Sequence, residues 1–315
     1  MKIAIVGPGI MPIPPKGWGA VEILIWDISK TLESMGHEVL IVNTPNRLRL
    51  LLQLKAFKPD FVHIQYDEYV SISSDLNCPC AITSHYGFLE QPHRFGPYQH
   101  VMDQFLELQP NIFCLSPGIL QTYKHHFDYP EEKLFLVPNG VNSGNFRFSS
   151  DPKHPDKSIY LAKIDQRKRQ SWFQKINSIY YVGNLADSSF DTSKNYLGEW
   201  KKNTLYDSLT EFGNLILLSD CEAHPLVCME ALTSGLGLVI SEYATANLDT
   251  ALPFISVIPE DRIRDIKFVE EEIIRNREIS IPVRDEIREY GKSFDWQKII
   301  DQYLLPSIDH LISIN

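Results

Sequence analysis

Two glutamates, Glu222 and Glu230, are separated by seven residues in the segment with the strongest chemical signature. A strand is expected just before them, and Pro225 suits the first position of a following helix, where its missing N–H has no consequence. The backbone amides around that helix N-terminus would suit a phosphate, and they belong to His224, Leu226, Val227 and Cys228. The two glutamates can then contact different hydroxyl groups of one extended ligand. The simpler alternative is one charge stabilising the helix dipole and one exposed helical glutamate.

A basic run at residues 163–169 directly follows a predicted strand, although the protein as a whole is acidic. Lys163 and Lys168 belong to this run. Lysines in such a place can neutralise a diphosphate as negative charge develops on a leaving group. The alternative is a solvated charged surface, which is the commoner origin of a charge run.

Glycines follow the first predicted strand. Gly7 and Gly9 end it, and a proline-containing loop leads to Gly17 and Gly19, which flank Trp18. Glycines entering a helix allow a backbone to approach a ligand closely. A dinucleotide fingerprint would need glycine at position 12 and an acidic residue at position 43, where the chain has proline and asparagine. Nicotinamide binding is therefore disfavoured.

His85 follows another predicted strand and precedes Tyr86 and Gly87. Parallel sheets bind ligands at the carboxyl ends of their strands, so His85 is a candidate, with a purely structural histidine as the alternative. Two pairs of residues, Cys78 with Cys80 and His125 with His126, lack the spacing and supporting ligands of a zinc site. We therefore expect no metal site.

The elements that must position these residues alternate between short apolar runs and amphipathic segments. The expected strands are Ile3–Val6, Val39–Val42, Phe61–Ile64, Ala81–Thr83, Ile112–Leu115, Ser158–Ala162, Ser178–Val182, Leu215–Leu218, Leu238–Ser241 and Phe254–Ile258. The expected helices are Ala20–Met35, Thr204–Phe212, Pro225–Ser234 and Pro259–Asn276, with a further helical stripe beginning at Trp296. Strand, helix, strand in this order predicts two parallel α/β sheets, with a polar linker between them.

Composition limits the function classes. The chain has 315 residues and a formal net charge of −10, which argues against general binding to nucleic acid or to an anionic membrane. No apolar run approaches the length of a membrane span, and the first apolar run is too short for a signal peptide. The five cysteines are an odd number without a Cys-x-x-Cys pair. We expect a reduced, cytoplasmic protein.

Taken in order, these segments resemble the retaining glycosyltransferases of family 4, which have the GT-B fold of two facing Rossmann-like domains. The resemblance is carried by residues 14–22, 85–87 and 137–142, by Lys163 with Lys168, by Gly183, and by residues 222–230. It departs from the usual family pattern at Trp18, at Ala162 with Lys163, and at residues 223–225. The resemblance implies transfer of a sugar from a nucleoside diphosphate to a hydroxyl group with retained anomeric configuration.

The resemblance also implies roles for individual residues. Lys163 and Lys168 would bind the donor diphosphate, Glu230 the ribose hydroxyls, and Glu222 the hydroxyls of the transferred sugar. The remaining donor contacts would come from Gly17, Gly19, Gly183, His224, Leu226 and Val227. His85 would lie near the reacting sugar and, with Trp18, Glu22 and Tyr86, on the acceptor side. The leaving phosphate would take the acceptor proton, so no enzymic base is required.

The same resemblance sets the expected domain organisation. Residues 1–142 would form the acceptor-side domain, 143–157 a linker, 158–295 the nucleotide-sugar domain, and 296–315 a helix returning to the first domain. We expect no cofactor or metal, a UDP-sugar donor rather than a GDP-sugar, and a glycan, lipid or other hydroxyl acceptor, with peripheral membrane contact left open. The alternatives are an inactive sugar-nucleotide-binding protein and a nucleotide-sugar epimerase of the same fold.

Overall fold

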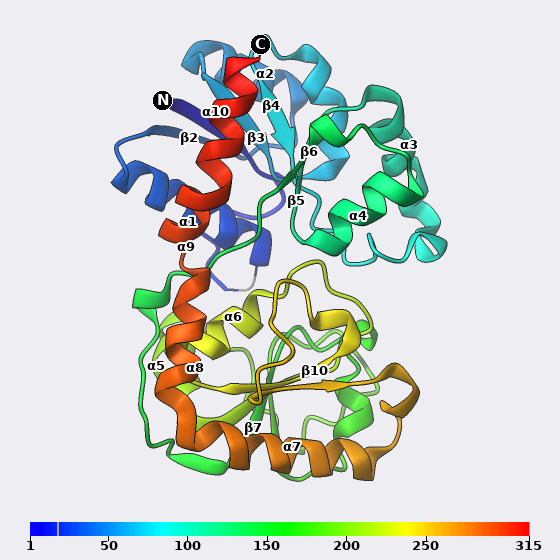
Figure 1. The fold of residues 1–315 in the computed structure, drawn as a ribbon, viewed down its shortest axis with the longest axis vertical. Helices are drawn as coiled ribbons and strands as arrows, with labels where there is room; N and C mark the ends of the chain where they lie inside the picture. The colour runs from blue at the N-terminus through cyan, green and yellow to red at the C-terminus, as the bar shows by residue number, and fades with distance from the viewer. Residues whose placement is uncertain (18, 315) are drawn as a thin grey trace. The chain divides into compact units, whose positions relative to one another are not determined.

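The computed structural model describes residues 1–17 and 19–314, and the chain divides into two compact units (Figure 1). The first unit comprises Met1–Gly140 together with Trp296–Asn315, and the second comprises Val141–Asp295. Each unit is built around its own parallel sheet, as the alternation of strand and helix patterns predicts.

The sheet of the first unit has six strands in the order β2-β1-β3-β4-β5-β6. The strands are β1 Lys2–Val6, β2 Glu38–Val42, β3 Phe61–Ile64, β4 Cys80–Ile82, β5 Asn111–Cys114 and β6 Leu134–Leu136. Every neighbouring pair is parallel. Ile3 to Val6 are almost fully buried. Because both faces of a parallel sheet are covered, its strands are continuous apolar runs, and this is why they could be recognised in the sequence.

The helices of the first unit are α1 Ala20–Ser34, α2 Arg47–Phe57, α3 Gln99–Leu108 and α4 Pro117–His126. The apolar stripe predicted for α1 is present, since Leu24, Ile25, Ile28 and Leu32 are buried. Gly36 follows the helix with φ 87°, a left-handed conformation that suits glycine and ends the helix as predicted.

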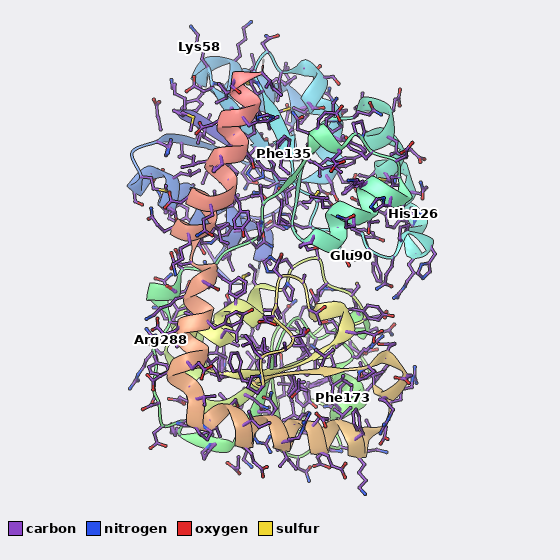
Figure 2. The ribbon with its side chains drawn as sticks, viewed as in Figure 1. Lys58, Glu90, His126, Phe135, Phe173 and Arg288 are labelled. Atoms are coloured by element: carbon purple, nitrogen blue, oxygen red, sulfur yellow. The ribbon has the colours of Figure 1, made fainter. Side chains whose placement is uncertain are left out.

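The C-terminal segment belongs to the first unit. It consists of α9 Trp296–Ile299, a π-helical stretch at Ile300–Leu304 and α10 Leu305–Ser313. Residues of α9 contact α1. The ring of His310 in α10 lies 5.8 Å from that of Phe135 in β6, and Phe135 is labelled in Figure 2. Trp296, Ile300, Leu304 and Ile308 are buried. The apolar stripe of this helix therefore packs on the first unit.

The sheet of the second unit has five parallel strands in the order β11-β10-β9-β7-β8. The strands are β7 His154–Leu161, β8 Ile179–Val182, β9 Phe212–Leu217, β10 Gly237–Ser241 and β11 Ile255–Ile258. The helices are α5 Lys202–Ser208, α6 Leu226–Thr233, α7 Ile266–Ser280 and α8 Arg284–Gly291. The buried core includes Phe173, which precedes β8 (Figure 2).

Several elements differ from the sequence prediction. Strand β6 and helices α2, α3, α4 and α8 were not predicted. Helix α2 buries only Leu50 and Leu54 and leaves Leu48 and Leu52 exposed, so it shows no clear apolar stripe. The helix predicted over 259–276 is a short 3-10 turn followed by α7, which begins at Ile266 after the N-cap Asp265.

The segment predicted as a polar linker contributes to the second unit. Its last four residues, 154–157, form the beginning of β7. Phe146 is 4% exposed, and the Ser149 carbonyl accepts a hydrogen bond of 2.8 Å from Arg284 Nε. The Arg147 amide donates to the Tyr206 carbonyl. Backbone hydrogen bonds of this kind cannot be inferred from a polar composition.

Candidate functional site

The basic run of the second unit forms a tight loop after β7. Asp165 caps a 3-10 turn, accepting a hydrogen bond of 2.9 Å from the Lys168 amide. This turn holds Lys168 in a buried position, whereas Lys163 is exposed. Gly183, at the end of β8, has φ 150°, and a Cβ there would lie 1.8 Å from the Ala162 carbonyl oxygen. Glycine is therefore required where the loops after β7 and β8 meet.

The glutamate motif lies where the sequence predicts it, with Glu222 in the loop between β9 and α6 and Glu230 within α6. Pro225 is the N-cap of α6 rather than its first helical residue. The Cys228 amide already donates to the Pro225 carbonyl at 3.2 Å, so our prediction that this amide is available to a phosphate is wrong. The first turn of α6 still presents the amides of Leu226 and Val227, which have no carbonyl one helical turn earlier to bind.

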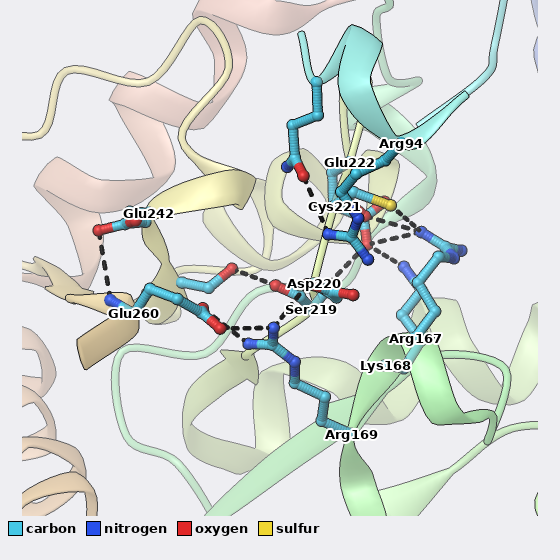
Figure 3. A network of polar contacts seen from close by, with 12 residues as sticks. Arg94, Arg167, Lys168, Arg169, Ser219, Asp220, Cys221, Glu222, Glu242 and Glu260 are labelled. Atoms are coloured by element: carbon cyan, nitrogen blue, oxygen red, sulfur yellow. Dashed lines mark hydrogen bonds and ion pairs between the residues drawn. The ribbon is translucent and has the colours of Figure 1, made fainter. Parts of the chain in front are cut away.

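Lys168 and Glu222 form an ion pair, and their side chains are each only 10% exposed (Figure 3). Glu222 Oε1 also accepts a hydrogen bond of 2.6 Å from Ser219 Oγ and lies 3.5 Å from Arg167. Within residues 1–17 and 19–314, every hydrogen bond and ion pair of Glu222 uses Oε1. The other carboxylate oxygen, Oε2, is thus the one through which Glu222 can accept a hydrogen bond from a ligand.

The charge state of Glu222 follows from these contacts. Burial alone would raise the pKa of Glu222, but Lys168 and Arg167 more than compensate, and the pKa is lowered. Glu222 is therefore ionised at neutral pH. Lys168 and Arg167 thus lie at Glu222, in the loop that leads to the N-terminus of α6, and cations and a helix N-terminus both favour an anion.

Arg169 belongs to the same basic run but has a structural role. Its guanidinium donates to both carboxylate oxygens of Glu260, at 2.9 and 2.7 Å, and to Asp220 at 2.6 Å (Figure 3). The residue is buried and adopts a left-handed conformation with φ 58°. Two carboxylates thus satisfy this cation within the protein.

Two further predicted donor residues, Glu230 and His224, lie on or next to α6. Glu230 is half-buried on the helix, and His224 is buried in the preceding loop. Burial raises the pKa of the Cys228 thiol, and Glu222 and Glu230 raise it further, so both glutamates lie near Cys228. The structure therefore brings Lys168, Glu222 and Glu230 into one region of the second unit.

The glycine loop of the first unit leads into α1. Gly19 is the N-cap of α1 with φ 140°, and a Cβ there would lie 3.0 Å from Glu22 Oε2. Glu22 is buried in the first turn, where a carboxylate stabilises the helix dipole. Gly17 is half-buried, and Trp18 lies outside the described residues. Gly19 is thus favoured at this position by its positive φ, which residues with a side chain rarely adopt.

His85 follows β4 in the first unit and belongs to a buried hydrogen-bond network. Its Nε2 lies 2.7 Å from Gln65 Oε1, and the Gln65 amide nitrogen lies 3.1 Å from His63 Nε2. Burial lowers the pKa of His85 to about 4, an effect that Asp67 only partly opposes. His85 is therefore neutral at pH 7, carries its proton on Nε2, and keeps Nδ1 as an acceptor.

A cavity of about 480 Å³ lies beside His85 and Tyr86, entirely within the first unit. Its other lining residues are Val21, Gln65, Tyr66, Asp67, Glu68, Phe95, Pro97, Tyr98 and His100. The volume falls in the range of small-molecule sites. Of the predicted acceptor-side residues, His85 and Tyr86 line this cavity and Glu22 does not.

The residues rejected as metal ligands lie apart from these sites. Cys80 is buried in β4 and Cys78 is half-buried before it. His125 and His126 are exposed at the end of α4.

In the described part of the chain, no helix is long and apolar enough to cross a membrane.

Several residues of both sites were missed at the sequence level. Arg167 and Ser219 contact Glu222 in the second unit, while Gln65, Asp67 and Tyr98 belong to the first. Arg167 lies within the predicted basic run, so its position was a usable signal. The other four carry no local motif, and only the fold brings them to the sites.

Comparison with known proteins gives one partial family match. Residues 43–144, about a third of the chain, match the model of Glycosyltransferase Family 4. No curated protein sequence is significantly similar to the chain.

Solved structures are similar over the whole chain. Sucrose-phosphate synthase from Thermosynechococcus elongatus has a TM-score of 0.78 at 14% identity and covers 100% of both chains. Anabaena HepE, solved in complex with UDP and glucose, has a TM-score of 0.71 at 13% identity, covering 98% of this chain and 100% of its own. The lipopolysaccharide outer core galactosyltransferase WaaB has a TM-score of 0.68 at 15% identity, with coverage of 98% and 100%. At these identities the likeness shows the fold, and the predicted GT-B fold class is confirmed.

Proposed function

We propose that the protein is a glycosyltransferase that moves a sugar from a nucleoside diphosphate sugar to a hydroxyl group. The observation that carries this proposal is the cluster in the second unit where Lys168 and Arg167 contact Glu222, in the loop just before the first turn of α6. The Glycosyltransferase Family 4 match and the GT-B fold support the same activity.

In this proposal the donor diphosphate binds to Lys168 and Lys163 and to the amides of Leu226 and Val227. Cleavage of the glycosidic bond leaves negative charge on the diphosphate, so fixed cations and amides at that position stabilise the transition state. Glu230 binds the ribose hydroxyls. Because these protein groups meet the phosphate charge, we propose that the reaction needs no metal ion.

Glu222 would bind the transferred sugar. Its Oε1 is held by Lys168 and Ser219, which fixes the carboxylate, and Oε2 accepts a hydrogen bond from a sugar hydroxyl. We propose retention of the anomeric configuration, with the leaving phosphate oxygen taking the acceptor proton. The roles predicted for Gly17, Gly19 and Gly183 in donor binding stay predictions.

The first unit would bind the acceptor. His85 and Tyr86 line its cavity, and neutral His85 offers an acceptor nitrogen to a hydroxyl group. We propose a UDP-sugar as the donor, because HepE was solved with UDP and glucose. We also propose a cytoplasmic location, because all five cysteines are unpaired thiols.

The test is a titration of UDP- and GDP-sugars, followed by assays of nucleoside diphosphate release against a panel of glycan and lipid acceptors. We expect stabilisation of the fold by a UDP-sugar through mass action, and release of UDP only when an acceptor is present. The anomeric proton coupling in the product reports retention by NMR. Donor binding without transfer to any acceptor would indicate an inactive binding protein, and interconversion of donors would indicate an epimerase.

A further inference from the structure

The cavity of the first unit lies at the carboxyl ends of β3 and β4 and is bordered by residues of a later segment. Gln65 to Glu68 follow β3, and His85 and Tyr86 follow β4. The later segment is the 3-10 turn at Gly96–Tyr98 with the start of α3, and it contributes Phe95, Pro97, Tyr98 and His100 to the lining. Open α/β sheets bind ligands at this edge, so the cavity has the position of a binding site.

The floor of the cavity is rigid. Asp67 is 8% exposed, and its Oδ2 accepts hydrogen bonds from Ser84 Oγ at 2.6 Å and from Tyr98 OH at 2.7 Å. The rings of Tyr86 and Tyr98 are stacked, with centroids 3.8 Å apart and planes 8° apart. The aromatic surface and the carboxylate are therefore held in place before any ligand binds, which lowers the entropic cost of binding.

The polar groups of the lining are mainly acceptors. Asp67 and Glu68 are carboxylates, and neutral His85 keeps Nδ1 as an acceptor because Nε2 donates to Gln65. Hydroxyl groups of a sugar donate to such acceptors, and the apolar face of a sugar ring packs on an aromatic ring such as that of Tyr66, which is half-buried. The lining combines both kinds of group.

The negative charge of the lining disfavours ligands that are themselves anionic. It contains two carboxylates and, among the described residues, no lysine or arginine, while His100 lies 3.9 Å from Glu68. A phosphate on the ligand would meet these carboxylates without a fixed cation. Two like charges about 8 Å apart at an effective dielectric constant of about 30 weaken binding about tenfold.

We propose that this cavity binds the acceptor through a sugar ring that carries neither phosphate nor carboxylate. The assignment of the cavity as the acceptor site rests on the proposed function, whereas the selection against anionic sugars rests on the cavity alone. Glu68 is the specificity-determining residue, because its side chain is half exposed at the cavity while Asp67 is already engaged by Ser84 and Tyr98.

The test is ligand-observed saturation-transfer NMR with matched sugars, in which each of several hexoses is offered as the neutral, 2-amino, 6-phosphate and uronic acid form. Saturating UDP is present to occupy the nucleotide site. We expect signals from a neutral or amino form and at least about tenfold weaker binding of the corresponding 6-phosphate and uronic acid.

Two variants test the assignment to the cavity. Glu68→Lys should strengthen binding of the 6-phosphate at least about tenfold, because the substitution replaces a repulsive charge with an attractive one. Glu107→Lys makes the same charge change on an exposed residue of α3 outside the lining, and should leave the preference unchanged.

Three results would overturn the proposal: anionic and neutral forms that bind equally well, the absence of binding by every neutral and amino form, or equal effects of the two lysine variants. A separate UDP-glucose titration without sugars tests the proposed function. Sugar binding in the cavity without donor binding would contradict the glycosyltransferase proposal and leave the selectivity of the cavity standing. Donor binding together with a preference for the 6-phosphate would support the glycosyltransferase proposal and overturn the proposed selectivity of the cavity.

Discussion

Replacing Lys168 with methionine should destabilise the second unit by about 2–3 kcal/mol. Breaking a buried ion pair by removing one partner costs about 3–5 kcal/mol, because the other charge stays buried without its partner. Here Glu222 keeps Ser219 and has Arg167 at 3.5 Å, so we place the cost below that range. The side chains of both partners are only 10% exposed, so solvent screening reduces the effect little.

The pair itself is measured by a double-mutant cycle with Lys168→Met and Glu222→Gln. We expect the double variant to be more stable than the sum of the single effects predicts, by about 2 kcal/mol. Lys175→Met removes a lysine from an exposed position of the same unit and should stay within about 0.5 kcal/mol of the wild type. Hydrogen exchange of the β9 amides reports the opening of the second unit, without the assumption that both units unfold together.

The pH dependence gives a second test. The pKa of Glu222 is lowered in the folded protein, so its stabilisation is present above the usual glutamate pKa and is lost as the pH falls through the lowered value. In Lys168→Met, burial raises the pKa of Glu222 with less opposition, and protonation relieves the buried charge. The destabilisation by Lys168→Met should therefore be larger at pH 7 than near pH 5. An equal loss at both pH values, or a coupling near zero, would refute the reasoning.

Gly183→Ala should destabilise the second unit by at least about 3 kcal/mol in the same exchange assay, because its Cβ would lie 1.8 Å from a backbone oxygen at φ 150°; a loss under 1 kcal/mol would contradict the geometry. His63 is 2% exposed, and burial lowers its pKa to about 3, so the stability that it contributes falls as the pH drops below about 6.5. Urea unfolding should show a loss of about 2 kcal/mol at pH 5 from this residue, which His63→Gln removes; an unchanged pH profile in the variant would exclude the assignment. Glu222→Gln should bind UDP as tightly as the wild type or up to about tenfold more tightly, because it frees Lys168, and it should slow transfer at least about tenfold. Calorimetry with UDP measures the first effect and a product assay the second. Weaker UDP binding would argue against the placement of the diphosphate. Transfer should persist in EDTA; its loss, with recovery on adding a divalent cation, would show that a metal takes part.

The sheets could be predicted because their physics leaves a local record. Central strands such as β1 and β9 are buried on both faces and therefore contain continuous apolar runs, at residues 3–6 and 215–217. Strand β6 leaves no such record, since it has three residues and lies at the edge of its sheet. Helix α2 could not be predicted either, because Leu48 and Leu52 are exposed and its leucines are therefore not confined to one buried face.

The candidate site could be predicted residue by residue but not as a set of contacts. Lys168 and Glu222 were assigned to different parts of a ligand, yet they bind each other across 54 positions of sequence. Arg169 has the same charge as its neighbour Lys168, and only the positions of Glu260 and Asp220 give it a structural role. Local composition shows which residue types are available, whereas their partners depend on long-range packing.

The pairing of Lys168 with Glu222 gives each residue two roles that oppose each other. Without a ligand, Glu222 neutralises a lysine that would otherwise be buried without a counter-ion, and this stabilises the fold. A diphosphate at the same lysine must compete with that carboxylate, so part of its binding energy replaces an existing contact. Stability and nucleotide affinity should therefore change in opposite directions when Glu222 is neutralised. A Glu222→Gln variant that lost both would mean that the carboxylate supports the fold of the site rather than competing for its cation.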